Sequence, residues 1–381
     1  MKKQRITLIL LFLGHLVFAQ KAETIQSFAT NPQSMMWYKQ QLKAWEKELS
    51  KDEKNENAWH NLFKAQRYIT NHDTTDKRKG TERQVEMQAI LDRMQEAIPN
   101  TYTVNYCNWV FHGNDMNYYS FLERAVAIDP HRPDHIDYMI NIGEMQRNVK
   151  QRDEFSLRKI ETGQMSPGLL YYNYNTLIGL EKNAILVTSG DNDTYPVWAL
   201  QAKGIRRDVK VINRYLISLK AYREKMFKEL GIEADDLDNV KPQGPFNEKL
   251  LQVLHSNSNH FPVYSALTCT GDDVYSDKVA ENLFLVGLAY AYKTSAFDNM
   301  AAMRKNVETL FAIDYLDKVF YEDFAAEKVK EVNRNYIVPF IKLYVHYKEA
   351  GELQKQNWIK EKLILLSKGN EEEETVLKFV D

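Results

Sequence analysis

The sequence has few cysteines and lacks a clustered cysteine motif. Only 2 of its 381 residues are cysteine, Cys107 and Cys269, and neither belongs to a Cys-x-x-Cys pair. This excludes a thioredoxin-type redox motif and a cysteine-rich zinc site. In an oxidising compartment the two residues could form a disulfide that joins two domains. Alternatively both are buried thiols, because distance in sequence does not tell whether their Cα atoms approach.

An excess of positive charge is also missing. The chain has 50 basic and 52 acidic residues, a formal net charge of −2, which excludes an electrostatic basis for binding nucleic acid. Glycine-rich phosphate-binding motifs, a Gly-x-Ser-x-Gly elbow and a His-Glu-x-x-His pair are absent. The sequence therefore offers no standard motif of nucleotide binding, serine hydrolysis or zinc proteolysis.

A short apolar run with the features of a targeting signal lies at the start of the chain. Three basic residues precede the run Ile6–Leu13, and Val17-Phe18-Ala19 is a plausible cleavage site before Gln20. This pattern predicts a secretory signal peptide at residues 1–19. An uncleaved anchor is the alternative, but a membrane span needs about 20 apolar residues. We expect the mature chain to have no membrane span and to be secreted across the inner membrane, into the periplasm.

Helical patterns flank the middle of the chain on both sides. Apolar residues at three- and four-residue spacings predict helices over Met35–Leu49, Ala58–Tyr68, Arg83–Ala97, Tyr118–Ile128 and His135–Val149. The last two resemble a tetratricopeptide repeat (TPR), because the first of them ends in Ala-x-x-x-Asp-Pro. Clean self-similarity at 34 residues is absent, so generic helical hairpins remain the alternative. Further helices are predicted at Leu310–Val319, Val329–Ala350 and Leu353–Leu366.

The middle of the chain alternates strands and helices. Strands are predicted at Ala184–Ser189, Val209–Asn213 and Pro262–Thr268, with intervening helices and a last helix over Asp277–Tyr292. Such alternation predicts a small three-stranded parallel, Rossmann-like sheet with right-handed crossovers. The predicted fold class is α/β plus α: a TPR-like region at residues 20–168, the α/β domain at 169–296 and a C-terminal helical region at 297–381.

Acidic and amide side chains follow all three predicted strands. A loop with Asp191, Asn192, Asp193 and Thr194 follows the first strand and precedes a helix predicted from Tyr195 with Pro196 in its first turn; Asn213 ends the second strand, and Asp272 and Asp273 follow the third. Because parallel strands end at one edge of the sheet, we expect these side chains to meet and bind a ligand. Four carboxylates, Asp191, Asp193, Asp272 and Asp273, are candidate ligands of Ca²⁺, Mg²⁺ or Mn²⁺.

A purely structural role for the same residues is the alternative. Asp193 or Thr194 could cap the following helix, and Asp191 and Asn192 could shape a turn after Gly190. If a ligand binds, a bare phosphate is disfavoured because two carboxylates would repel it. A sugar or a cationic peptide group fits better. A haloacid-dehalogenase-type phosphatase is also disfavoured, because Gly190 separates the strand from Asp191 and Asn213 replaces the expected Ser or Thr.

Several phrases of the middle segment carry a family resemblance. In order they are NAILVTSGDNDTYPVWALQ, GIRRDVKVIN, FPVYSALTC and VGLAYAY. They resemble the soluble region of a bacterial membrane-protein family with domain of unknown function 2723 (DUF2723), which is related to the protein O-mannosyltransferase-like proteins of animals. Its members carry Asn-Gly-Asp-Asn-Asp-Thr-Phe-Pro, where this chain has Ser189 for the first Asn and Tyr195 for Phe.

The resemblance implies an extracytoplasmic α/β module with helical neighbours. It does not imply glycosyl transfer, because that activity is expected in a multi-span membrane portion that this sequence lacks. We therefore predict a secreted, non-catalytic binding or scaffold protein with a protein or glycan partner. The alternative is an enzyme or accessory factor in glycan or glycoconjugate processing that uses a divalent metal at the acidic loop. An enzyme would depend on single loop carboxylates, whereas a scaffold would depend on surface patches of its helices.

Overall fold

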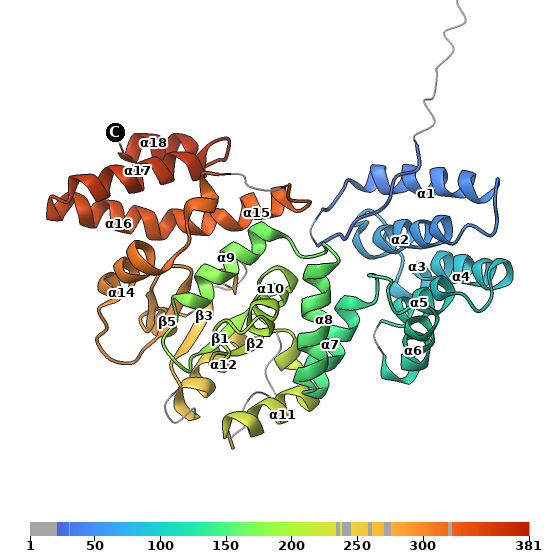
Figure 1. Cartoon of the computed structure of the whole chain (residues 1–381), viewed down its shortest axis with the longest axis horizontal. Coiled ribbons are helices and arrows are strands. Elements are labelled where there is room, and N and C mark those ends of the chain that lie inside the picture. Colours follow the sequence, from blue (N-terminus) through green and yellow to red (C-terminus); the bar gives the residue numbers. More distant parts are fainter. Residues whose placement is uncertain are drawn as a thin grey trace, which may run out of the picture. The chain divides into compact units, whose positions relative to one another are not determined.

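The computed structural model describes residues 21–29, 31–113, 115–233, 237, 245–257, 261–269, 276–318 and 322–380. The predicted signal peptide and the two residues Asp272 and Asp273 lie outside this part of the chain. The chain forms two compact units (Figure 1). The first comprises the residues up to Gln26 together with Gln33–Pro130, and the second comprises Ser27–Pro32 and His131–Asp381.

The first unit consists of helices. They are α1 (Met35–Leu49), α2 (Glu56–His72), α3 (Gly80–Arg83), α4 (Val85–Ala97), α5 (Tyr102–Phe111), a 3-10 turn at Met116–Tyr118, and α6 (Tyr119–Ile128). The two longest helices begin at polar caps: Ser34 accepts a hydrogen bond from the backbone N–H of Trp37, and Asn55 from that of Ala58. Such caps satisfy N–H groups that a helix start leaves without intrahelical acceptors.

The second unit begins with the helical hairpin α7 (Ile136–Gln146) and α8 (Val149–Glu161), followed by α9 (Pro167–Ile178). Its strands are β1 (Ile185–Thr188), β2 (Lys210–Asn213), β3 (Val263–Ala266), β4 (Leu283–Leu285) and β5 (Ala289–Tyr292). The helices between them are α10 (Asp191–Ala202), α11 (Lys220–Leu230), α12 (Pro245–Asn257) and α13 (Asp277–Ala280). After the sheet come α14 (Asn299–Lys305), a π-helical turn at Asn306–Leu310, α15 (Ala326–Asn333), α16 (Ile337–Ala350), α17 (Leu353–Ser367) and α18 (Glu373–Val380).

The sheet has five strands in the order β2-β1-β3-β5-β4. β1 pairs in parallel with β2 and β3, whereas β5 is antiparallel to both β3 and β4. The predicted three-stranded parallel sheet is therefore wrong, because the sheet is mixed and two strands larger. The helix predicted over Asp277–Tyr292 is also wrong: it ends at Ala280, and a β-hairpin follows.

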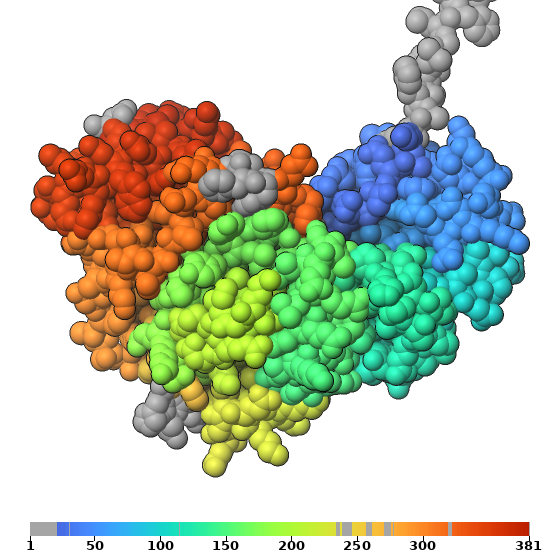
Figure 2. Space-filling view, viewed as in Figure 1, coloured from blue at the N-terminus to red at the C-terminus, as the bar shows by residue number. Residues whose placement is uncertain are grey.

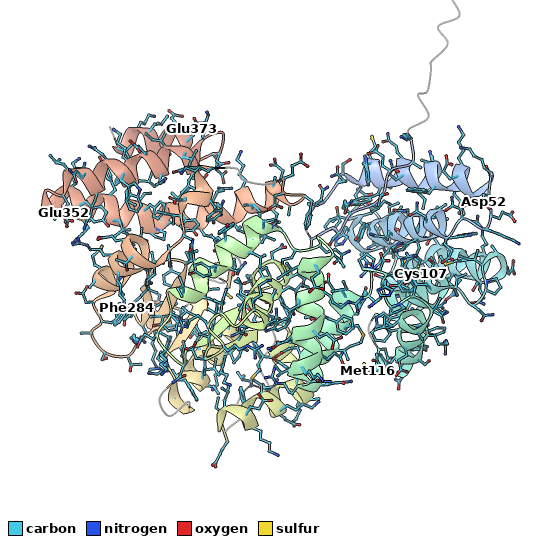
Figure 3. The ribbon with its side chains drawn as sticks, viewed as in Figure 1. Asp52, Cys107, Met116, Phe284, Glu352 and Glu373 are labelled. Atoms are coloured by element: carbon cyan, nitrogen blue, oxygen red, sulfur yellow. The ribbon has the colours of Figure 1, made fainter. Side chains whose placement is uncertain are left out.

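The hairpin turn explains this second error. Gly287 has a φ of +128°, which favours glycine, and a Cβ built there would lie 2.8 Å from Cζ of Phe311. The hairpin packs on both sides, so its residues form an almost continuous apolar run without the alternation of a half-exposed strand. Periodicity does not separate such a run from a buried helix. Phe284 of β4, labelled in Figure 3, packs edge-on against Phe297 with 5.8 Å between ring centroids.

The sheet lies in an apolar core that includes residues of α7 and α8, among them Ile136, Ile140 and Phe155. A second core cluster is built around α16 and α17 and contains Tyr336, Phe340 and Leu363. Cys107 of α5 (Figure 3) and Cys269, just after β3, are buried thiols that are not joined in a disulfide. Among the described residues, no helix has both the length and the hydropathy that crossing a membrane requires.

Candidate functional site

The carboxyl ends of β1, β2 and β3 meet at one edge of the sheet. β1 lies between β2 and β3, so the chain leaves β1 toward one neighbour and later returns on its other side. The crevice between the ends of β1 and β3 is thus a topological switch point, where open α/β sheets bind their ligands. We call it the switch-point crevice.

The residues predicted as an acidic loop are the first turn of α10. This helix begins at Asp191, four residues before the predicted Tyr195, so the loop assignment is wrong. Two aspartates in the first turn interact favourably with the positive end of the helix dipole. Pro196 therefore lies inside the helix, not in its first turn.

Asn173 of α9 compensates for this internal proline. Pro196 has no N–H to donate to the carbonyl of Asn192, four residues earlier. The side-chain Nδ2 of the buried Asn173 donates to that carbonyl at 2.9 Å instead. The side chain of Asn192 in turn donates to the carbonyl of Ala29 at 3.2 Å. The start of α10 is thus held by hydrogen bonds from outside the helix.

Asp193 occupies the switch-point crevice. Its side chain is buried, and its carboxylate accepts hydrogen bonds from the backbone N–H groups of Ser189 at 2.6 Å and Gly190 at 2.7 Å. The Thr268 hydroxyl, next to the end of β3, donates to the same carboxylate. Burial raises the pKa of Asp193, and these three hydrogen bonds oppose that rise. A carboxylate of the chain itself therefore lies next to a helix start, a position at which other proteins can bind an anion.

Thr194 and Asn213 lie together inside the protein. The hydroxyls of Thr188 and Thr194 are 2.8 Å apart, and Asn213 Nδ2 donates to Thr194 Oγ1 at 2.9 Å and to the carbonyl of Ser189 at 3.1 Å. Asn213 Oδ1 accepts hydrogen bonds from the backbone N–H groups of Tyr215 and Leu216. These side chains join the ends of β1 and β2 and use their hydrogen-bonding groups in doing so.

Asp191 differs from Asn192, Asp193, Thr194 and Asn213 because it is exposed. In the described part of the chain, no side chain or backbone N–H donates a hydrogen bond to its carboxylate. The surrounding protein desolvates the carboxyl group, and Asp137 of α7 adds repulsion, so the pKa of Asp191 rises to about 6. Water thus reaches a carboxylate that protein atoms surround on most sides.

Lys159 of α8 is a cation that acts on both Asp137 and Asp191. It forms an ion pair with Asp137, and its Nζ lies 5.3 Å from the ring centroid of Tyr195. The Tyr195 hydroxyl accepts a hydrogen bond from Asn141 Nδ2 at 2.6 Å. One lysine faces two carboxylates, so this group of residues keeps a capacity to accept hydrogen bonds from a sugar hydroxyl or a cationic group.

The proposed metal site cannot be assembled from the described residues alone. Among them, no group of three or more His, Cys, Asp or Glu side chains is placed to hold a metal ion. The Asp193 carboxylate already accepts hydrogen bonds from three donors of the chain. Asp272 and Asp273 lie outside the described residues. Binding of Ca²⁺, Mg²⁺ or Mn²⁺ by the four carboxylates remains a prediction.

Sequence reasoning missed several residues that build this edge. The sequence predicts Thr268 only as the end of a strand, although its hydroxyl next to the sheet edge is a signal for a hydrogen-bond donor at the site. Arg214 is buried and donates to the carbonyl of Cys269 at 3.1 Å and to the Tyr215 hydroxyl at 2.8 Å, which ties the end of β2 to the end of β3. Asp137 and Lys159 lie on other elements and carry no local signal for this site.

One known protein family and one solved structure are similar to this chain. Residues 171–362 match the family model TMEM260-associated domain 2. Among solved structures, the chain is similar to the crystal structure of yeast Tom70, with 12% identity and a TM-score of 0.26, over 91% of this chain. The chain spans only 58% of the length of that Tom70 chain, and a TM-score this low supports no argument about fold or function. No curated protein matches the chain.

The family match bears on the resemblance seen in the sequence. It does not show DUF2723 itself, but it does place the resembling phrases inside a recognised domain. The matched residues run from within α9 to within α17 and include the whole sheet and the switch-point crevice. They make up just over half of the chain, which therefore belongs to the TMEM260-associated domain 2 family.

Proposed function

We propose that the chain is a non-catalytic, extracytoplasmic binding protein that holds a protein partner on TPR-like helical surfaces. The observation that carries this proposal is the carboxylate of Asp193 in the switch-point crevice, where it accepts hydrogen bonds from Ser189, Gly190 and Thr268. The place at which this type of sheet would bind a substrate is filled by the chain itself. The proposed compartment rests on the signal-peptide pattern of residues 1–19.

Exposed apolar side chains on the last helices support a protein partner. Val338 and Val345 of α16 are 52% and 36% exposed, and they lie seven residues apart, on one face of the helix. Leu353, Ile364 and Leu365 of the neighbouring α17 are also exposed. Both helices contribute to the red surface in Figure 2. These exposed apolar side chains on two neighbouring helices are compatible with binding to another protein.

A second candidate function rests on Asp191. A solvent-reached carboxyl group with a pKa of about 6, to which none of the described residues donates a hydrogen bond, suits general acid or base chemistry. An enzyme or accessory factor that acts on glycans, with a divalent metal at this edge, is therefore the alternative. It would require Asp191 itself, whereas the binding function would not.

Ligand-dependent unfolding separates the two candidates. The thermal midpoint of the full chain is measured with EDTA, with Ca²⁺, Mg²⁺ or Mn²⁺, and with simple sugars, for the unmodified chain and Asp191→Asn. A ligand bound only by the folded state raises the midpoint by mass action. We expect no ligand to raise it. A rise in the unmodified chain that Asp191→Asn abolishes would favour the enzyme.

Site-specific cross-linking tests the binding function directly. A photo-cross-linking residue is placed at Val338, with exposed Glu96 of α4, in the first unit, as the control position. We expect a protein cross-linked from Val338 that also binds the purified chain, and we expect Val338→Asp to weaken that binding while Asp191→Asn does not. The proposal fails if binding depends on Asp191 and is indifferent to Val338. Cell fractionation with protease protection checks the compartment.

A further inference from the structure

Residues 21–26 run extended, without regular secondary structure, along the hairpin of α1 and α2 in the first unit. The buried side chain of Gln41 contacts this segment at two points. Its Oε1 accepts a hydrogen bond from the backbone N–H of Glu23 at 2.8 Å, and its Nε2 donates to the carbonyl of Lys21 at 3.2 Å. One amide side chain of α1 therefore forms hydrogen bonds with two backbone groups of the segment.

Two further side chains continue the same pattern. The indole Nε1 of Trp45 donates to the carbonyl of Glu23 at 3.1 Å. The Oδ1 of Asn61, on α2, accepts a hydrogen bond from the backbone N–H of Ile25 at 2.8 Å. Asn61 is itself oriented by its Nδ2, which donates to the carbonyl of Asn57 at 2.8 Å. Its oxygen is thereby directed at the segment.

The contacts fall on every second residue, 21, 23 and 25, as expected for an extended chain with one side against the protein. All four hydrogen bonds go to backbone groups, so they recognise extended geometry and not a particular sequence. Only Ile25 adds side-chain selection, because it is 1% exposed whereas its neighbours Thr24 and Gln26 are exposed. This is how proteins bind an extended peptide ligand: backbone contacts give affinity, and pockets for alternate side chains give specificity.

We propose that α1 and α2 form a receptor for an extended peptide and that residues 21–26 occupy it as an intramolecular competitor. The partner supplies an extended segment with an aliphatic side chain in place of Ile25. Gln41 and Asn61 are 0% and 2% exposed, so leaving this groove empty would strand buried amide groups. Exchange for another peptide keeps every hydrogen bond. The inference rests on the proposed function, of which it names one site and the class of partner.

A labelled peptide tests the exchange. The probe is a fluorescent peptide with the sequence of residues 21–27, KAETIQS, added to the full-length chain and followed by anisotropy. The unmodified chain is compared with Ile25→Asp, which places a charge in the apolar pocket and releases the segment. Thr24→Asp is the matched control, because it adds the same charge at an exposed neighbour.

The tethered segment sets the concentration range. A short tether gives the segment an effective concentration on the order of 1 mM at the groove. The segment fills the groove at that concentration only if the same peptide, when free, binds with a Kd well below about 1 mM. We expect Ile25→Asp to bind the probe with such a Kd, and the unmodified chain and Thr24→Asp to bind it at least about tenfold more weakly. A probe that carries Asp in place of Ile should not bind.

The groove itself is tested in the released chain. Adding Gln41→Ala to Ile25→Asp should weaken probe binding at least about tenfold, since two backbone groups of the probe lose their hydrogen-bond partner. Gln40→Ala, an exposed glutamine beside it, should leave binding unchanged. Should Ile25→Asp not fold, as judged by circular dichroism, Ile25→Ala takes its place.

Two results would overturn the inference. One is a folded, released chain that does not bind the probe at 1 mM. The other is probe binding of equal strength to the unmodified chain and Ile25→Asp. Either result leaves the cross-linking from Val338 unaffected, so a failure of this groove is distinguishable from a failure of the proposed binding function.

Discussion

The switch-point crevice and the groove on α1 and α2 both satisfy polar groups with atoms of the same chain, but over different sequence distances. In the crevice, Asp193 accepts hydrogen bonds from backbone groups 3 and 4 residues away. In the groove, Gln41 and Asn61 hold peptide groups that lie 18 and 36 residues away. Asp193 belongs to the same helix start as the groups that it bonds, so it cannot leave the crevice on its own. Residues 21–26 are joined to α1 only through the intervening chain, so we expect that they can leave the groove while α1 and α2 stay folded.

This difference assigns the two regions different roles. Without the carboxylate of Asp193, the backbone N–H groups of Ser189 and Gly190 and the Thr268 hydroxyl would lose their acceptor, so we expect the crevice to have a structural role. Residues 21–26 can leave the groove while α1 and α2 keep their own hydrogen bonds and caps. The groove is therefore the region in which an external ligand can replace an internal one.

The largest expected effect comes from Asp193→Ala. It leaves two backbone N–H groups and the Thr268 hydroxyl without their acceptor in a buried place, and we expect the free energy of unfolding of the second unit to fall by about 3–5 kcal/mol. Thermal unfolding followed by circular dichroism measures it. Asp191→Asn, two residues away and exposed, is the control. An equally small effect of both substitutions would contradict a structural crevice.

The next largest effect compares an aliphatic residue of the core with one of the segment in the groove, both in the first unit. Leu62 and Ile25 are 0% and 1% exposed. Leu62→Ala leaves a cavity in the core and should cost about 3 kcal/mol. Ile25→Ala should lower the thermal midpoint much less, because the segment can undock, and should instead speed hydrogen exchange at the amides of Glu23 and Ile25. If Ile25→Ala costs as much as Leu62→Ala, the segment is core and not a separable occupant.

A double-mutant cycle tests how the start of α10 is held. Asn173→Ala removes the donor to the Asn192 carbonyl and should cost about 1–2 kcal/mol. In a Pro196→Ala background, the new backbone N–H can donate to that carbonyl, so the same substitution should cost about 1 kcal/mol less. Urea unfolding of the four chains gives the coupling energy. Additive effects would show that Asn173 does not compensate for Pro196.

The smallest effect concerns Asp191 and pH. Its pKa is about 6 in the folded chain against 3.8 ordinarily, so the folded state binds the proton more tightly than the unfolded state. The stability gained from the protonated form is complete below pH 3.8 and is lost as the pH rises through 6. Asp191→Asn should therefore stabilise the chain by about 1 kcal/mol at pH 7.5, after allowing for exposure, and by nothing near pH 4. Thermal midpoints at both pH values measure this. An equal gain at both would exclude the charge as the cause.

Local patterns predicted the strands better than the sheet. β1, β2 and β3 each lie within a predicted strand, because each is a short apolar run bounded by turn residues. The sequence predicts a helix where β4 and β5 lie, because the turn at Gly287 packs against the distant Phe311 and leaves no local signal. The start of α10 was placed too late, because the proline rule favours the first turn and the compensating Asn173 lies on another helix.

The sequence alone determined the composition of the sheet edge, including Asp191, Asn192, Asp193, Thr194 and Asn213. The tertiary structure decided what each of them does. Capping and periodicity act over three or four residues, so they can be read along the chain. Thr268, which donates a hydrogen bond to Asp193, and Asp137, which helps to raise the pKa of Asp191, are 75 and 54 residues away along the chain from these aspartates, and only folding brings them near. The same holds for Gln41 and Glu23: neither residue carries a local signal for the other, because an amide recognises any extended backbone that the fold places beside it.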